Sequence, residues 1–361
     1  MKTAYLLAGT ELSVLWRLVR RNKAGFSPRY IPRLLFLLNA GMWSSLFSVI
    51  EKKRYGKHIA ASPLPDNPII IVGHWRTGST WLHQLLSLDP SLVTPTLFQA
   101  ALPRSFFSAR LYFAPVMRFS IHKKRPMDNV KLGIDEPMED EYALLRLCGF
   151  SPLEGLIFPQ DTSYFLNDFP GFLPEQNISE WEKALNYFCR KLTFNNKQTL
   201  LLKNPFHSLR IQFLSEIFPK ARFVHIYRSP YAVVPSTLNM WETVGQQNRM
   251  KCNHTPISMR EVADMYQHLL TFIEQALNNI PLQRQYSIRY ENLEKQPENT
   301  IRDMYRHFGM DFSDVFCKNI QQFLQENTNF NKNIFTPTPD DKAIIATVLA
   351  DAIKKYDYAA N

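Results

Sequence analysis

The sequence predicts an α/β fold of three layers, in which helices cover both faces of a parallel sheet, with a helical segment in front of it. Four short apolar runs predict this class, because each is followed by a turn and then by apolar residues at helical spacing. Odd and even positions of these runs are both apolar, which is typical of strands buried on two faces. The 361 residues, 45% of them hydrophobic, suffice for a large core.

The predicted elements alternate along the chain as strand, turn and helix. Their order is a strand at 68–73 and a helix at 79–88, a strand at 199–203 and a helix from 208, a strand at 222–227 and a helix beyond 230, and a strand at 286–289 and a helix at 290–309. The stretch 91–198, rich in Phe and Pro, is expected to form helices and loops at the sheet edge. Ligands of parallel sheets bind beyond the carboxyl ends of the strands, so the turns after the strands are the candidate site.

The positive charge is concentrated at the N-terminus. Residues 1–60 hold eleven Lys and Arg against two Glu, which accounts for nearly all of the net charge of +10. Because the rest of the chain is almost neutral, nucleic-acid binding is disfavoured. A proline-rich stretch, "ASPLPDNP", follows and indicates a boundary. We therefore expect a basic helical segment at 1–62 and a second domain at 63–361.

The basic segment also contains an apolar run at 34–50, seventeen residues without a charge. This is short for a membrane span. Basic residues beside Leu, Phe and Trp fit a helix lying on an anionic membrane surface better, and a hairpin packed on the protein stays open as the third reading. The run begins too late for a signal peptide. Four scattered cysteines fit a reducing compartment, so we expect a cytoplasmic protein with peripheral membrane contact.

The turn after the first strand predicts an anion site. It reads Arg76-Thr77-Gly78-Ser79-Thr80, a positive charge, a glycine and two hydroxyls at the start of a helix. Backbone N–H groups at a helix N-terminus bind anions through geometry and the helix dipole. The turn lacks the Gly-Lys-Ser/Thr of nucleoside triphosphatases, and no strand ends in an Asp suited to magnesium, so a nucleotide kinase is disfavoured. The plainer alternative is a tight turn capped by Ser79.

The turn after the third strand supplies a second pair of anion-binding groups. Arg228 ends that strand, and Ser236 follows eight residues later in the next helix. An arginine and a serine in this arrangement are suited to holding one phosphate from two sides. Taken alone the pair is a weak signal, because an Arg-Ser-Pro turn is common.

In this order the two motifs resemble the signatures of the sulfotransferase superfamily, whose members use 3′-phosphoadenosine 5′-phosphosulfate (PAPS). The resemblance covers about 68–300 and looks closest to the bacterial sulfotransferase-like group, with "GHWRTGSTWLHQLLSLDPSLVTPT", "RPMDN", "DEPMEDEYAL" and "LLLKNPFH". It implies a P-loop-like sheet and a sulfotransferase domain at 63–361. It further implies that 76–81 holds the 5′-phosphosulfate, that Arg228 and Ser236 hold the 3′-phosphate, and that no metal takes part.

The same resemblance implies that two aromatic residues lie near the adenine of the donor. Trp81 would stack on or near the adenine, although a tryptophan packed in the core explains it equally well. Tyr290, in "IRYENL", matches a Tyr-Glu-Asp-Leu-like element whose tyrosine lies near the adenine. Glu291 beside it is expected to fix local structure.

Sulfuryl transfer requires a general base that takes the proton of the acceptor. His207 is one candidate, because cytosolic relatives place Lys-x-His after this strand, although the spacing here is Lys-x₃-His from Lys203. Lys203 would contact the sulfate, and Arg76 would stabilise the leaving oxygen. The rival candidates are Glu139 and Glu141 in "DEPMEDEYALL", where Pro137 is predicted to start a helix.

The acceptor is only indirectly indicated. The Phe- and Pro-rich segment 91–175 would line an apolar acceptor cleft, which favours a lipid or another hydrophobic alcohol. A PAPS-binding protein without catalytic activity and a scaffold on the membrane surface remain as alternatives to the enzyme.

Overall fold

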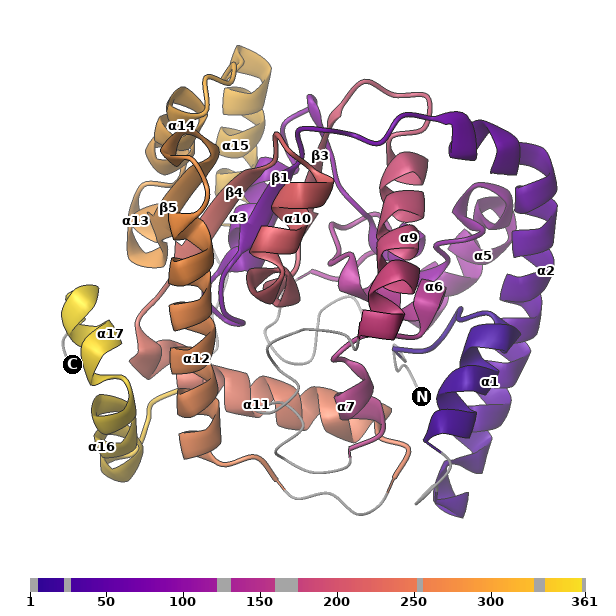
Figure 1. The fold of residues 1–361 in the computed structure, drawn as a ribbon, viewed down its shortest axis with the longest axis horizontal. Helices are drawn as coiled ribbons and strands as arrows, with labels where there is room; N and C mark the ends of the chain where they lie inside the picture. The colour runs from indigo at the N-terminus through magenta and orange to yellow at the C-terminus, as the bar shows by residue number, and fades with distance from the viewer. Residues whose placement is uncertain are drawn as a thin grey trace. The chain divides into compact units, whose positions relative to one another are not determined.

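The computed structural model describes residues 6–22, 27–121, 131–159, 175–251, 256–327 and 335–358. The "RPMDN" motif at 125–129 and residues 160–174 of the predicted acceptor segment lie outside them. The chain forms two compact units. We call them the helical unit (1–65, 95–196 and 242–256) and the sheet unit (66–94, 197–241 and 257–361). Figure 1 labels their elements.

The sheet unit contains one parallel sheet of five strands among the described residues, ordered β2-β3-β1-β4-β5. The predicted three-layer α/β class is therefore confirmed. The strands are β1 (Ile69–Val72), β2 (Leu92–Val93), β3 (Thr199–Lys203), β4 (Arg222–Tyr227) and β5 (Gln285–Arg289). The sequence did not predict β2, because two residues are too few to show a periodic pattern.

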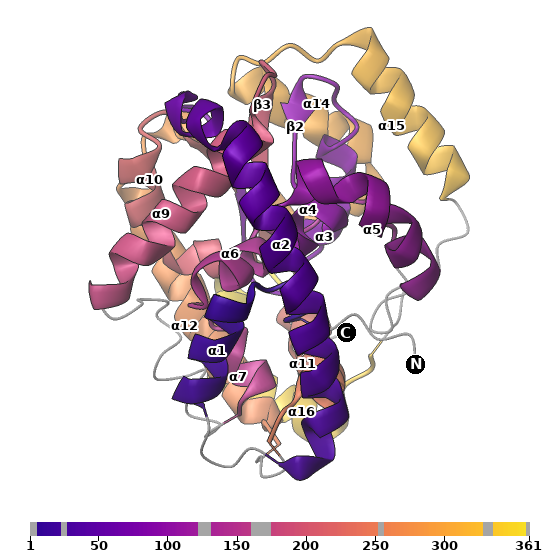
Figure 2. The same cartoon turned by 90° about the vertical axis from the view of Figure 1, so that its right-hand side faces the viewer.

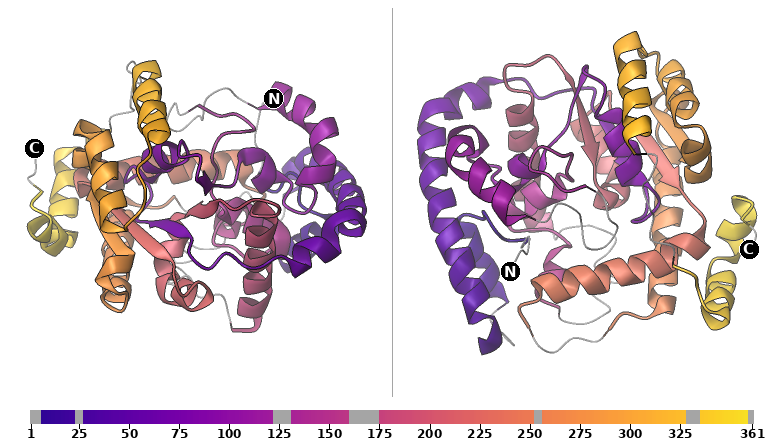
Figure 3. Two further views of the ribbon diagram at one scale, coloured as in Figure 1. Left: turned by 90° about the horizontal axis from the view of Figure 1, so that it is seen from above. Right: turned by 180° about the vertical axis from the view of Figure 1, so that it is seen from behind.

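Helices cover both faces of this sheet. Seen from the front in Figure 1, α10 (Ile211–Ile217) and α12 (Met259–Asn278) lie before the strands. The opposite face carries α3 (Ser79–Leu86), α14 (Pro297–His307) and α15 (Asp314–Glu326), which Figure 3 shows from behind. Ile69 and Ile71 of β1 belong to the core on this second side. Ile70 is equally buried, because alternate side chains of a strand point to opposite faces.

The remaining elements of the sheet unit extend from these layers. They are the 3₁₀ helices η2 (Pro205–Leu209) and η3 (Leu282–Arg284), and the helices α13 (Tyr290–Lys295), α16 (Pro339–Val348) and α17 (Ala350–Lys355). Helix α11 (Pro230–Asn248) starts in the sheet unit and ends in the helical unit.

The helical unit confirms a helical N-terminal segment. Helix α2 (Ile31–Ala61) contacts α1 (Leu12–Arg21), α5 (Phe106–Ser120) and α9 (Glu175–Leu192), as Figure 2 shows from the side of α2. The shorter elements are η1 (Pro28–Tyr30), α4 (Leu97–Ala101), α6 (Glu141–Cys148) and α7 (Glu154–Ile157). The predicted division at residue 62 stays a prediction.

The helix expected from Ser208 was placed too early. Ser208 lies inside η2, and α10 begins three residues later. The Asn204 side chain accepts the backbone N–H of Phe206 and so caps a 3₁₀ turn that starts at a proline. The helix expected at 79–88 ends at Leu86.

Two further predicted helices have other bounds in the structure, and in both cases a proline is involved. The helix expected at 290–309 is split into α13 and α14, because Gln296 is not helical and Pro297 starts a new helix. The helix expected from Pro137 begins at Glu141 instead. Pro137 forms an isolated β-bridge with Thr96, so Glu139 precedes the helix.

Candidate functional site

The end of β1 is held close to both neighbouring strands. Gly73 has φ +147°, and a Cβ there would lie 2.4 Å from the carbonyl oxygen of Ile226 in β4. The Gly73 N–H donates to Ser208 Oγ at 2.8 Å, and the Ser208 hydroxyl donates to the Gly73 carbonyl at 3.1 Å. The turn after β1 is therefore fixed before its functional residues begin. The sequence gives no sign of the role of Ser208, because its partner is 135 residues away.

The turn itself uses left-handed backbone at two positions. Arg76 has φ +67° and Gly78 has φ +94°. Between them the Thr77 hydroxyl donates to the carbonyl of His74 at 2.7 Å. Helix α3 begins at Ser79 without a capping side chain or an acidic residue in its first turn. Its N-terminal N–H groups and positive dipole end are thus arranged to receive an anion.

The two predicted motifs meet at Arg76. Its Nε donates to Ser236 Oγ in α11 at 2.8 Å, and Nη1 of Arg228 donates to the Arg76 carbonyl at 3.3 Å. Residues 152 and 160 positions apart are thus joined at one edge of the sheet. An arginine of each motif and the predicted serine lie within one hydrogen-bonded group beside the N-terminus of α3.

Tyr290 lies directly against this group. A Cβ on Gly78 would approach Tyr290 Cδ2 to 2.1 Å, so only glycine leaves room for the ring. The guanidinium of Arg228 lies 4.3 Å from the centroid of the same ring, a cation–π contact. The phenol donates to Glu294 at 2.8 Å. Burial raises the pKa of Tyr290, with the charge of Arg228 opposing.

The backbone around Arg228 is fixed from two further sides. The hydroxyl of Tyr266 donates to the Arg228 carbonyl at 3.0 Å. Glu291 accepts the N–H of Ser229 at 3.3 Å and the hydroxyl of Tyr358 at 3.2 Å. These contacts agree with the expected structural role of Glu291. Neither tyrosine could be found from the sequence, because both act across long chain separations.

A third cation, which is buried, lies beside the turn. Lys203, the last residue of β3, donates to Thr80 Oγ1 at 3.4 Å. Its charge reaches His83 in α3, whose pKa is held well below its usual value by burial first and by Lys203 second. The His83 ring contacts Thr94 Oγ1 at 2.5 Å. The positive charge predicted beside the turn is therefore present, and His83 is a neighbour that the sequence did not single out.

The histidines near the strand ends are buried. His207 lies within η2 and is fully buried. His74 contacts the Trp75 carbonyl through Nδ1 at 2.9 Å, and its ring centroid lies 4.8 Å from that of Tyr266. Burial lowers the pKa of His74 to about 4.

The other predicted residues lie on α3 or in the helical unit. Trp81 is half-buried and packs on Phe323 of α15, with ring centroids 5.4 Å apart. Glu139 and Glu141 belong to the helical unit, where Glu141 is fully buried. Among the residues that the structure describes, no three His, Cys, Asp or Glu side chains form a metal-binding group.

Comparisons with known proteins identify similar sequences and structures. Residues 68–314 match the model of the sulfotransferase family. The chain is 30% identical over 358 residues to the omega-hydroxy-beta-dihydromenaquinone-9 sulfotransferase Stf3 of Mycobacterium bovis, covering 98% of this chain and 92% of that protein. The same protein from Mycobacterium tuberculosis matches equally.

Solved structures share the fold. The sulfotransferase STF9 from Mycobacterium avium is similar with a TM-score of 0.73 and 17% identity, over 97% of both chains. The sulfotransferase STF1 from Mycobacterium tuberculosis is similar with a TM-score of 0.63 and 19% identity, over 93% of this chain and 91% of that one.

Proposed function

The chain belongs to the sulfotransferase family, and we propose that it transfers a sulfuryl group from PAPS to the hydroxyl of a hydrophobic acceptor. The observation that carries the proposal is the meeting of the two phosphate motifs at Arg76, which hydrogen-bonds Ser236 and accepts from Arg228. A donor with phosphates at both the 3′ and 5′ positions of one nucleoside needs two anion sites that lie close together. Nucleoside triphosphates carry their phosphates in one chain and do not need a second anion site for a 3′-phosphate.

The 5′-phosphosulfate is assigned to the turn 76–80 and the first turn of α3. Its N–H groups, its hydroxyls and Arg76 supply hydrogen bonds and positive charge. The 3′-phosphate is assigned to Arg228 and Ser236. Trp81 and Tyr290 are proposed for the adenine, since both rings lie beside this turn or the helix that follows it.

The proposed reaction is an in-line displacement at sulfur. The acceptor oxygen forms a bond to sulfur while the bond between sulfur and the 5′-phosphate oxygen breaks, and that oxygen leaves with the electron pair. Lys203 and Arg76 stabilise the negative charge that develops there, because both cations lie beside the turn. The products are a sulfate ester and adenosine 3′,5′-bisphosphate.

The acceptor proton goes to a general base, for which we propose His207. It lies in η2, four residues beyond Lys203 and next to the carboxyl end of β3. Glu139 and Glu141 are the alternatives. A proton acceptor at this step contributes on the order of 10²- to 10⁴-fold to the rate.

For the acceptor we propose a lipid that carries a terminal hydroxyl, such as a hydroxylated isoprenoid quinone. The name of the mycobacterial relative describes an omega-hydroxylated dihydromenaquinone as its acceptor, and the two chains match over nearly their full lengths. The aromatic composition of the segment 91–175 agrees with an apolar chain. A cytoplasmic enzyme that contacts the membrane through residues 1–60 would meet such a lipid at the bilayer surface.

The donor site is tested by calorimetric titration with adenosine 3′,5′-bisphosphate and, separately, adenosine 5′-monophosphate. Wild type is expected to bind the bisphosphate at least tenfold more tightly, and Arg228→Ala is expected to remove that preference. Arg302→Ala is the control, because Arg302 of α14 also lies over an aromatic ring, that of Phe312. Equal binding of the two nucleotides by wild type would contradict the proposal.

The transfer step is tested with PAPS and a long-chain isoprenoid alcohol. His207→Gln is expected to lower kcat about 100-fold or more. His225→Gln serves as the control, a buried histidine inside β4. Tight bisphosphate binding without transfer to any alcohol would favour the catalytically inactive alternative.

A further inference from the structure

We propose that the helical unit docks on an anionic membrane surface through one apolar face formed jointly by α2 and α5, with both helices lying along the surface. This deepens the proposed function and rests on it for the identity of the acceptor, a lipid. It also goes beyond the N-terminal segment, because α5 (Phe106–Ser120) lies outside residues 1–60.

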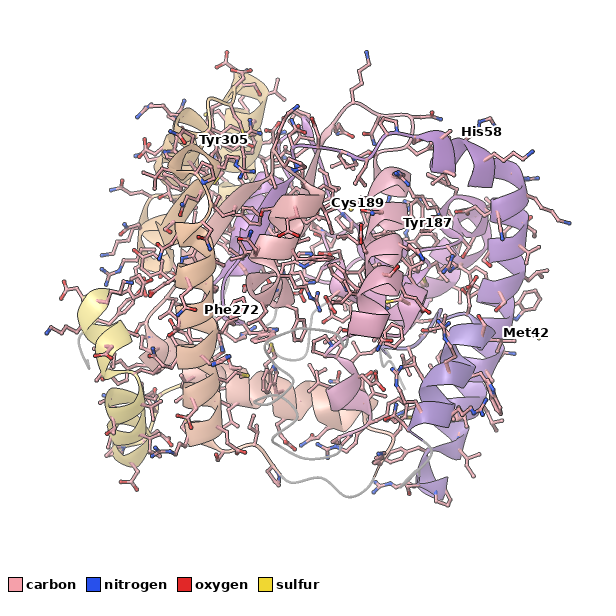
Figure 4. The ribbon with its side chains drawn as sticks, in the orientation of Figure 1. Met42, His58, Tyr187, Cys189, Phe272 and Tyr305 are labelled. Atoms are coloured by element: carbon pink, nitrogen blue, oxygen red, sulfur yellow. The ribbon has the colours of Figure 1, made fainter. Side chains whose placement is uncertain are left out.

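The first half of the face is a stripe along α2. Six of its exposed large apolar side chains recur every three or four residues: Ile31, Leu35, Leu38, Met42, Leu46 and Val49. Phe36 and Trp43 are exposed as well. The spacing of the six places them on one side of the helix over about 27 Å. Figure 4 labels Met42 on the outer side of α2, away from α9. Apolar residues of a soluble surface helix normally face the core, so this stripe faces the wrong way for packing within the unit.

The second half of the face is on α5. Leu111 and Phe119 are 79% and 86% exposed, and Tyr112 and Val116 are exposed beside them. Phe47 of α2 joins the two halves, because its ring lies 5.3 Å from that of Tyr112. Figure 2 shows the two helices side by side. The exposed apolar side chains of both helices therefore form a neighbouring pair of stripes.

The charges near this apolar face favour an anionic membrane as its binding partner. The C-terminal turns of α2 expose four cations: Lys52, Lys53, Arg54 and Lys57. The one acidic residue of α2, Glu51, is buried, and α5 has none in its sequence. An apolar stripe with cations at its end matches the acyl boundary and the headgroups of an anionic membrane. A second copy of this chain would instead bring like charges together.

The contacts on the opposite side of α2 favour a helix that lies on the membrane over one that crosses it. By length and composition, 28–61 would suffice to span a bilayer. However, the Ser44 hydroxyl donates to the Gly9 carbonyl at 2.6 Å, and a Cβ on Gly41 would lie 2.8 Å from the Thr10 carbonyl. Glu51 pairs with the buried Lys191. A helix with these protein contacts on one side has only the other side for lipid.

The test is flotation with vesicles of phosphatidylcholine alone and of phosphatidylcholine with phosphatidylglycerol. Wild type is expected to bind the anionic vesicles at least tenfold more tightly. The variant Leu46→Ser/Leu111→Ser/Phe119→Ser is expected to lose at least tenfold in this binding, and Lys52→Glu/Lys53→Glu to lose the preference for anionic lipid. The control is Leu282→Ser/Val315→Ser, which removes two exposed apolar side chains from the sheet unit.

Bisphosphate titration and light scattering on the same proteins separate the outcomes. If the triple variant still binds the bisphosphate as wild type does, only docking was lost. If wild type binds vesicles but no bisphosphate, the proposed function is contradicted and the docking proposal stands. Equal vesicle binding by the triple variant and its control would overturn the docking proposal. A wild-type dimer that the triple variant abolishes, without vesicle binding, would assign the face to a second copy and overturn it too.

Discussion

Gly78 determines whether Tyr290 can lie against the turn after β1. Its φ of +94° is unfavourable for any side chain, and a Cβ would overlap the Tyr290 ring at 2.1 Å. We predict that Gly78→Ala lowers the free energy of unfolding by ~3 kcal/mol or more, the backbone part being about 1–2 kcal/mol. Bisphosphate affinity should also fall about tenfold, because the moved ring disturbs Arg228. Urea unfolding and calorimetry measure the two effects.

Gly309 offers the matched control for this substitution. It has φ +62°, but a Cβ there would meet nothing within 4 Å. Gly309→Ala should therefore show the backbone cost alone, about 1 kcal/mol, without any change in bisphosphate binding. If the two substitutions cost the same, the overlap with Tyr290 is not what requires a glycine at position 78.

The residues of the candidate site were predictable only where a motif names them. The turn around Arg76 indicates anion binding by itself, whereas Arg228 and Ser236 are a weak pair that only the family resemblance links to it. The structure joins all three. The position of Tyr290 over Gly78 was not predictable, because it depends on how α13 packs against the turn. The roles assigned to these residues in binding PAPS stay a prediction.

At the scale of elements, a buried ion pair joins α2 to α9. The side chains of Glu51 and Lys191 are 1% and 0% exposed. The Lys191 ammonium also donates to the carbonyl of Pro103 at 2.8 Å, and Glu51 accepts the N–H of Ser108 at 2.7 Å. Burial lowers the pKa of Lys191 to about 8, with Glu51 opposing. Removing either partner would leave the other charge buried alone.

We predict that Glu51→Leu or Lys191→Met alone lowers the free energy of unfolding by ~3–5 kcal/mol. The double variant Glu51→Leu/Lys191→Met should cost clearly less than the sum, because no charge is left buried. Urea unfolding followed by circular dichroism measures all three. Lys220→Met is the control, since the pair of Lys220 with Asp66 is exposed and should be worth at most ~1 kcal/mol. Single variants that cost no more than this control would show that the pair does not hold the two helices together.

The elements themselves were predictable where burial acts on both faces. The bounds of β3 and β4 agree with the apolar runs, because strands inside a parallel sheet are mostly apolar on both faces. Helix starts were less predictable. A side-chain cap by Asn204 and a long-range bridge of Pro137 to Thr96 decided two of them, and neither leaves a periodic signal.

For the whole molecule, the alternation of strands and helices was enough to predict the α/β class. The division into two units was not visible in the sequence, because each unit is assembled from three separate chain segments. The charge pattern distinguished the basic N-terminal residues, but it carries no information on which later segments pack with them.

The sheet unit as a whole should lose stability in mild acid, because it buries neutral histidines. Burial lowers the pKa of His74 and of His225 to about 4, and for His225 the facing Glu274 opposes this while Lys355 adds to it. Between pH 6.5 and 4 the unfolded chain therefore binds protons that the folded chain does not, so the free energy of unfolding falls as pH falls. The expected loss on going from about pH 7 to about pH 5 is roughly 2 kcal/mol per histidine.

Hydrogen exchange of the β1 and β4 amides at about pH 7 and about pH 5, corrected for intrinsic exchange rates, measures this loss locally. His83 is buried with a lowered pKa as well, so His225→Gln removes one of three such histidines and about a third of the pH-dependent loss of protection, roughly 2 kcal/mol. His307→Gln is the control, because His307 lies exposed on α14. A loss that stays the same in His225→Gln and in wild type would show that carboxyl groups, and not the buried histidines, make the sheet unit sensitive to acid.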